Sequence, residues 1–134
     1  MSASMSTVSG RRLTGLPLFE LGTIAGLLGI VWIHFLDLAD KMEETPYLGV
    51  AYLGLIAGCA AAVILLARRD RRGFVLAGGL AGATIIGYAL SRTTGLPAAT
   101  DDIGNWTETL GVWSLVVEGA VVMLAVAAHR FRVR

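Results

Sequence analysis

The sequence predicts an all-α membrane protein, a bundle of four transmembrane helices with both termini in the cytoplasm. Three observations predict this architecture. Hydrophobic residues make up 55% of the 134 positions and charged residues only 16%, so the chain has too few charges to cover a water-soluble domain. Four apolar segments each have about the 20 residues that a helix needs to cross a bilayer. The arginines also fall on one side of these segments.

The spans are predicted for residues 17–38, 46–67, 74–91 and 107–128, with residues 1–16 and 129–134 as cytoplasmic tails. Pro17 and Pro46 mark the starts of the first two spans, because a proline in the first turn of a helix loses no hydrogen bond. A cleaved signal peptide is the alternative for the first span. Its apolar stretch is long, however, and lacks the small residues of a cleavage site.

Basic and acidic residues are separated by the four spans. Arginines precede the first span, fill the link between the second and third, and follow the fourth, whereas the other two links are acidic. By the positive-inside rule the arginine-bearing segments are cytoplasmic. We therefore expect a multi-pass plasma-membrane protein, and the acidic side is called the outer side. The arginines are Arg11, Arg12, Arg68, Arg69, Arg71, Arg72, Arg130, Arg132 and Arg134.

Polar residues gather in the two outer links and at the helix ends next to them. His34 and Asp37 are three residues apart and share a face of the first helix. Three interpretations stay open: an ion-pair clasp made by Arg92 and His34, a divalent-cation site at His34 and Asp37, and a binding surface for a small molecule or partner. The outer cluster comprises His34, Asp37, Asp40, Glu44, Arg92, Asp101, Asp102 and Glu108.

Other polar residues are expected inside the spans, where a charge is costly. Glu118 lies near the middle of the fourth span, and Ser114 lies one turn outward on nearly the same face. Glu118 is expected either to be a neutral carboxyl bonded to a neighbouring helix or to handle protons or cations. Glu20 lies in the first turn of the first helix, where a carboxylate suits the helix dipole, and we interpret it as structural.

Glycines four residues apart recur in the first three spans, and such pairs let helices approach closely in a bilayer. We interpret them as contacts within one bundle, with a homo-oligomer or a larger membrane complex as the alternative. The pairs are Gly22 with Gly26, Gly54 with Gly58, and Gly78 with Gly82.

Several stretches of the chain resemble a group of small four-helix bacterial membrane proteins. They are HFLDLADKMEETPYLG at residues 34–49, SRTTGLP at residues 91–97, DDIGNW at residues 101–106 and VEG around Glu118. The most specific of them is the SRTxGLP motif. The resemblance implies the fold, a bacterial origin and the outer position of the polar cluster, and it implies no reaction. Relatives carry a second histidine beside an acidic residue where this chain has Asp40 and Lys41, which weakens the metal-site interpretation.

The loop that contains this motif is expected to be an ordered outer lid. Arg92 ends the third helix and would pin the lid, Gly95 permits a left-handed turn, and Pro97 stiffens the exit. The fourth helix then follows with Asn105 or Thr107 as its cap.

The first functional hypothesis is a non-enzymatic interaction or accessory subunit with an ordered, acidic outer face. The alternative is a small transporter or cation-binding protein that uses Glu118 with His34 and Asp37. A membrane enzyme is a third hypothesis, although no catalytic residue can be named because the chain has no phosphate loop, cysteine pair or nucleophile motif. No cofactor and no nucleic acid is predicted. The expected partners are the lipid bilayer and either other membrane subunits or further copies of the chain.

Overall fold

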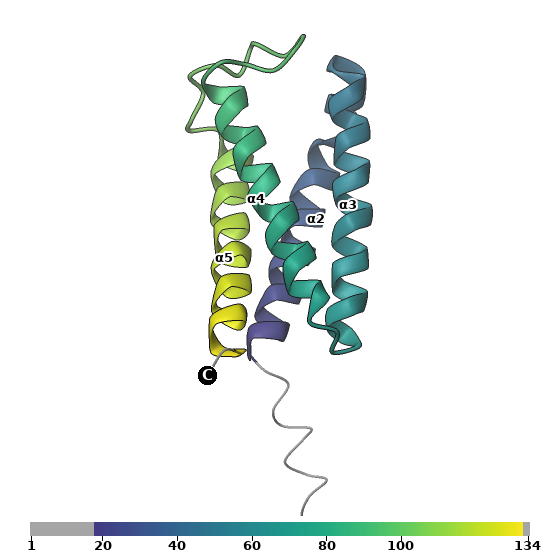
Figure 1. Ribbon diagram of the computed structural model, residues 1–134. Helices are drawn as coiled ribbons and strands as arrows, with labels where there is room; N and C mark the ends of the chain where they lie inside the picture. Colours follow the sequence, from purple (N-terminus) through teal and green to yellow (C-terminus); the bar gives the residue numbers. More distant parts are fainter. Residues whose placement is uncertain (1–17, 133–134) are drawn as a thin grey trace, which may run out of the picture.

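The structure is a computed structural model and describes residues 18–132. In this range four long helices form an antiparallel bundle (Figure 1): α2 (Leu18–Glu44), α3 (Pro46–Ala67), α4 (Arg72–Arg92) and α5 (Thr109–Arg132). Each helix is long and apolar enough to cross a membrane. The chain is a four-span membrane protein, and the predicted all-α bundle of four helices is confirmed; the side of the membrane on which the termini lie stays a prediction. The predicted N-terminal tail at residues 1–16 and the last two residues of the C-terminal tail lie outside the described residues.

The helix bounds differ from the predicted spans where a helix continues beyond the apolar stretch. The bounds of α3 agree with the prediction, and α4 extends the predicted span slightly at both ends. By contrast, α2 continues to Glu44, because the unbranched side chains of Lys41, Met42 and Glu43 favour a helix after the hydrophobic run has ended. The fourth helix starts at Thr109, two residues later than predicted, because residues 106 and 107 form a turn of the loop, so neither Asn105 nor Thr107 is its cap. At its other end it continues beyond the predicted span to Arg132.

Each helix packs against two neighbours. α2 packs against α3 and α5, and α4 packs against the same two helices, so α2 and α4 barely touch across the diagonal. α3 and α4 lie together at the end where residues 68–71 join them, and they diverge toward the other end (Figure 1). The space between the helices is therefore narrow at one end of the bundle and wide at the other.

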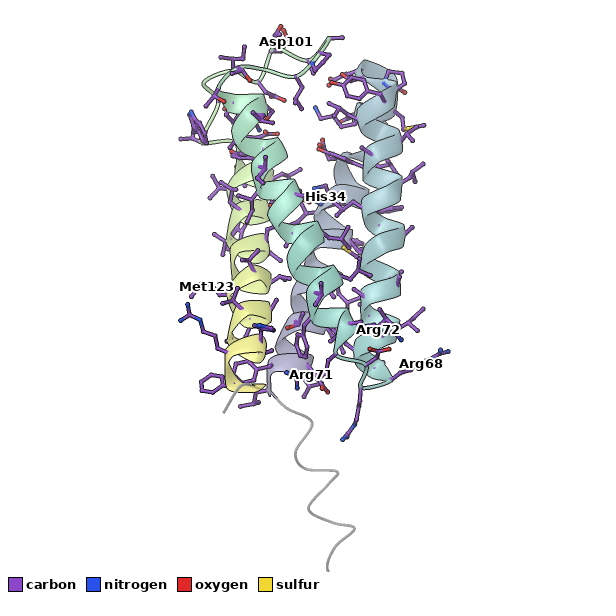
Figure 2. The ribbon with its side chains drawn as sticks, in the orientation of Figure 1. His34, Arg68, Arg71, Arg72, Asp101 and Met123 are labelled. Carbon is purple, nitrogen blue, oxygen red and sulfur yellow. The ribbon has the colours of Figure 1, made fainter. Side chains whose placement is uncertain are left out.

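The two ends of the bundle differ in charge. Figure 2 shows Arg68, Arg71 and Arg72 at one end and Asp101, in the long loop of residues 93–108, at the other. We call these the arginine end and the loop end. At the arginine end, the Arg72 guanidinium donates hydrogen bonds to Asp70, and these hold the pKa of Asp70 below its ordinary value.

The packed apolar core lies in the half of the bundle next to the arginine end. Glycines of α2 face branched side chains of α5 there: a Cβ built on Gly26 would lie 2.5 Å from Val121 Cγ2, and one on Gly22 would lie 3.1 Å from Leu124 Cδ1. Small residues thus bring these two helices close together, as expected for packing in lipid. The core residues are Leu27, Ile30, Cys59, Ala62, Leu66, Phe74, Ala77, Ala81, Val121, Ala125 and Ala128.

Candidate functional site: a cavity in the loop half of the bundle

The widened half of the bundle contains a cavity of about 370 Å³, which all four helices and the loop line. Toward the arginine end, α3 and α4 meet where a Cβ on Gly58 would lie 2.9 Å from Leu80 Cδ1. Most of the cavity wall is apolar. Its polar lining residues are His34, Asp37, Lys41, Tyr52, Thr84, Tyr88, Ser91, Arg92, Asp102, Glu108 and Ser114.

One face of α2 supplies the polar stripe of the cavity wall. His34, Asp37 and Lys41 are spaced by three and four residues, so the helical repeat places them on the same side of α2. This stripe continues the buried face of α2, which runs through Leu27 and Ile30 in the core. The same helix face is therefore apolar in the core and polar along the cavity.

His34 lies in the interior of the bundle (Figure 2), where its ring bridges α2 and α5. Its Nδ1 is 2.9 Å from the carbonyl oxygen of Ile30, and its Nε2 is 3.9 Å from Glu118 Oε1. A carbonyl oxygen only accepts hydrogen bonds, so Nδ1 carries the proton in this contact. In the neutral ring Nε2 is then an acceptor that faces the carboxyl group of α5.

Glu118 lies directly behind the cavity wall and is 0% exposed. Ser114, one turn away on α5, donates a hydrogen bond to Glu118 Oε1. Glu118 Oε2 is buried and has no hydrogen-bond partner among the described residues. Buried carboxyl oxygens are almost always bonded, so this oxygen marks an incomplete polar site.

Tyr52 of α3 connects this site to the loop end. Its hydroxyl donates to Asp37 Oδ2 at 3.1 Å, and its ring meets the His34 ring edge-on with the centroids 4.8 Å apart. Three helices thus contribute to one polar chain along the cavity, from Asp37 through Tyr52 and His34 to Glu118.

Arg92 joins α4 to the loop through ion pairs. One terminal nitrogen lies 3.1 Å from Asp102 Oδ2 and the other donates to Glu108 Oε2, so Arg92 bridges two carboxylates. The guanidinium also lies over the Tyr88 ring, 4.4 Å from its centroid. His34, by contrast, lies deeper in the bundle and faces Glu118, so it does not take part in the Arg92 ion pairs.

The loop itself is folded against the helix ends. Gly95 has a φ of 78°, which confirms the predicted left-handed turn, and Gly104 N donates to Arg92 O at 2.8 Å. Between α3 and the loop, the Tyr47 hydroxyl donates to Pro97 O at 2.6 Å. These contacts give the loop a defined position over the cavity.

The remaining predicted residues lie outside the cavity lining. Asp40 and Asp101 are exposed, and Glu44 forms a 3.4 Å ion pair with Lys41. Glu20 is buried far from this site, near the arginine end, in the first turn of α2. Within residues 18–132, no three His, Cys, Asp or Glu side chains are grouped so that they could hold a metal ion.

Sequence reasoning missed several residues of the site. Tyr52 and Thr84 each have apolar neighbours on both sides in the sequence, and a polar residue within such a stretch was the available signal. Tyr88 is packed under Arg92 and against Gly111, where a Cβ would lie 2.6 Å from the Tyr88 ring. Gly111 thus leaves space for an aromatic ring, which explains a glycine on the polar face of α5.

Comparison of the chain with protein-family models, with curated proteins and with solved structures gave no match.

Proposed function

We propose that this chain is a multi-pass protein of a bacterial plasma membrane, with both termini cytoplasmic, that binds a small lipophilic cation in the cavity. The proposed orientation rests on the arginines of residues 68–72 and 130, which lie at one end of the bundle, and on the positive-inside rule. The proposed binding function rests on one observation above all. His34 and Ser114 line a cavity and both contact a fully buried carboxyl group, that of Glu118.

The size and lining of the cavity support a small ligand with an apolar body. Its volume of about 370 Å³ lies within the range of about 300–1,000 Å³ for small-molecule sites. Leucine, isoleucine and alanine side chains from α2, α3, α4 and α5 form most of the wall. A few polar groups within an apolar wall are the usual arrangement for orienting such a ligand.

The charges support a cationic group on the ligand. Three carboxylates and two cations line the cavity, and the Glu118 carboxyl lies behind its wall. Ion pairs engage both lining cations and two of the three lining carboxylates: Arg92 pairs with Asp102 and Glu108, and Lys41 pairs with Glu44 at 3.4 Å. The third lining carboxylate, Asp37, lies outside these pairs and accepts a hydrogen bond from Tyr52. At the inner end of the cavity, His34 Nε2 and the Glu118 carboxyl group can accept hydrogen bonds from a positively charged group of the ligand.

Filling the cavity should abolish binding. Gly87 of α4 lines the cavity and has no atom within 4 Å of a built Cβ, so Gly87→Phe would place a ring in the ligand space without a clash. We expect the affinity for the lipophilic amine amantadine, measured by isothermal titration in detergent, to fall on the order of tenfold or more. Gly82→Phe is the matched control, because Gly82 lies in the same helix, has equal space and does not line the cavity.

Equal binding by the wild type and Gly87→Phe would contradict the proposal, as would an equal loss in Gly82→Phe. Native mass spectra of the protein from its own membrane provide a second readout. A bound small organic cation that is lost in Gly87→Phe is the expected result.

Glu118→Gln should remove the pH dependence of binding. We expect the amine to displace a proton from the Glu118 carboxyl group, so binding releases a proton and the affinity rises with pH. For one proton the rise is up to about tenfold per pH unit. The glutamine variant should bind more weakly, with an affinity that is flat across neutral pH. Glu20→Gln, which removes a buried carboxyl away from the cavity, should keep the wild-type slope; loss of the slope there would contradict the assignment.

A second candidate is an interaction or accessory subunit whose partner meets the loop end. The ordered loop favours it, because Ile103 and Trp106 are each more than two-fifths exposed on a surface that Tyr47 and Arg92 fix in place. In the native mass spectra this function would give a stable complex with a different membrane protein, unaffected by Gly87→Phe.

A further inference from the structure

A second hollow lies on the outside of the bundle, at the arginine end between α4 and α5. It has a volume of about 340 Å³ and is distinct from the cavity in the loop half, with which it shares no lining residue. Its lining divides into an apolar part and a basic part. The apolar part comprises Phe74, Val75, Gly78, Gly79, Val122, Ala125 and Val126, and the basic part comprises Arg71, His129 and Arg130.

The apolar part is a groove that faces the lipid. Its floor is formed where α4 and α5 pack closely, since a Cβ on Gly78 would lie 3.1 Å from Ala125 Cβ. Gly79 is exposed and has no atom within 4 Å of a built Cβ, so the groove is open beside it. An acyl chain is the apolar group that a membrane supplies for such a groove.

The basic part lies where a lipid headgroup would follow that acyl chain. Arg71 N–H donates to the carbonyl oxygen of Ala128 at 2.8 Å, which holds its guanidinium across the junction of α4 and α5. His129 and Arg130 are exposed on the last turns of α5. A guanidinium already held in position loses less freedom when it binds an anion.

The charge around the groove is positive. Among the residues that the structure describes, no carboxylate lines it. Asp70, the nearest acidic residue in sequence to Arg71, is engaged by the Arg72 guanidinium at 2.6 Å. Arginine side chains at the end of a membrane-spanning bundle are attracted to anionic lipids and not to zwitterionic ones.

We propose that this groove binds an anionic phospholipid, with its phosphate at Arg71 and Arg130 and an acyl chain along Gly79. The basic rim and the open apolar groove fit the two parts of one lipid molecule, and this complementarity of charge and polarity carries the proposal. The site is independent of the proposed cation cavity, so either can fail without the other.

The test uses the full chain, delipidated in detergent and offered phosphatidylglycerol and phosphatidylcholine with equal acyl chains. Native mass spectrometry counts the retained lipid. The wild type should retain phosphatidylglycerol in preference to phosphatidylcholine, and Arg130→Gln should reduce that preference about fivefold, the effect of one arginine near an anionic surface. Arg68→Gln, an exposed arginine at the same end that does not line the groove, should leave it unchanged.

A second variant tests the contribution of the apolar groove independently of the basic side chains. Gly79→Leu would fill the apolar groove and should abolish retention of the lipid, whereas Gly82→Leu, outside the groove, should not. Excess inorganic phosphate should not displace the lipid, because the acyl chain provides part of the binding. Equal retention of both lipids by the wild type would overturn the proposal. So would displacement by phosphate alone, or equal losses in Arg68→Gln and Arg130→Gln.

Discussion

Replacing Arg92 with alanine should loosen the loop end and lower the free energy of unfolding by about 2–3 kcal/mol. Arg92 is 5% exposed, and its removal would leave the carboxylates of Asp102 and Glu108 without their main cation. Breaking a fully buried ion pair costs about 3–5 kcal/mol. The effect here is smaller because the side chains of Asp102 and Glu108 are 32% and 42% exposed, so water would solvate them in part.

The loop should show this effect first. Chymotrypsin cleavage after Trp106 would accelerate in Arg92→Ala, because the loop would lose its ion pairs to α4. Arg72→Ala is the matched control: Arg72 also forms an ion pair, with Asp70, but its side chain is 83% exposed and lies at the arginine end. An exposed ion pair contributes little to stability, and this one lies at the opposite end of the bundle, so loop cleavage should be unchanged in this control. Equal cleavage of wild type and Arg92→Ala would show that other contacts order the loop.

Gly26→Leu should destabilise the bundle by about 3 kcal/mol, the upper part of the usual cost of overpacking. A Cβ at Gly26 would lie 2.5 Å from Val121 Cγ2, and Val121 is fully buried in the core. A leucine there would push α2 away from α5 and open the tightest contact of the core. The thermal midpoint in detergent, followed by tryptophan fluorescence, should fall accordingly.

Two controls test the cause of that loss. Gly54→Leu adds the same side chain at a helix position with no atom within 4 Å of the built Cβ, so its midpoint should stay near the wild-type value. Val121→Ala removes the methyl group that clashes, so the double variant should be less destabilised than the sum of the two single variants. Strict additivity would mean that this pair does not determine how closely α2 and α5 approach.

The fold was predictable from the sequence because each span carries its own signal. Length and hydropathy located the four helices, and the predicted bounds of α3 agree with the structure. The end of α2 was less predictable. Hydropathy reports where a helix leaves the apolar layer, whereas helix propensity carried α2 on to Glu44.

Individual residues of the site could be predicted from the sequence, but the contacts between them across the helices could not. His34 and Glu118 were both singled out, and one functional hypothesis used both, but they were placed at different depths, one at the outer side and one inside the membrane. Their approach to 3.9 Å depends on the register between α2 and α5, which is determined by contacts such as that of Gly26 with Val121. A single sequence carries no local signal for such a register. The cavity was unpredictable for the same reason, since it arises from the divergence of α3 and α4.

The loop is attached to the bundle unevenly, and this has a mechanical consequence. On the side of α4 it is held by the Arg92 ion pairs and by the hydrogen bond between Gly104 N and Arg92 O. On the side of α3, in the range that the structure covers, the hydrogen bond from Tyr47 to Pro97 is the one polar tie. The polar attachment of the loop to α3 is therefore about one hydrogen bond, which contributes about 1 kcal/mol net. The four helices are tightly packed around the core near the arginine end, whereas at the loop end α3 is only weakly attached to the loop. The affinity of the proposed ligand would then depend on the residues that line the cavity, whereas its rate of exchange would depend on the contact between Tyr47 and Pro97.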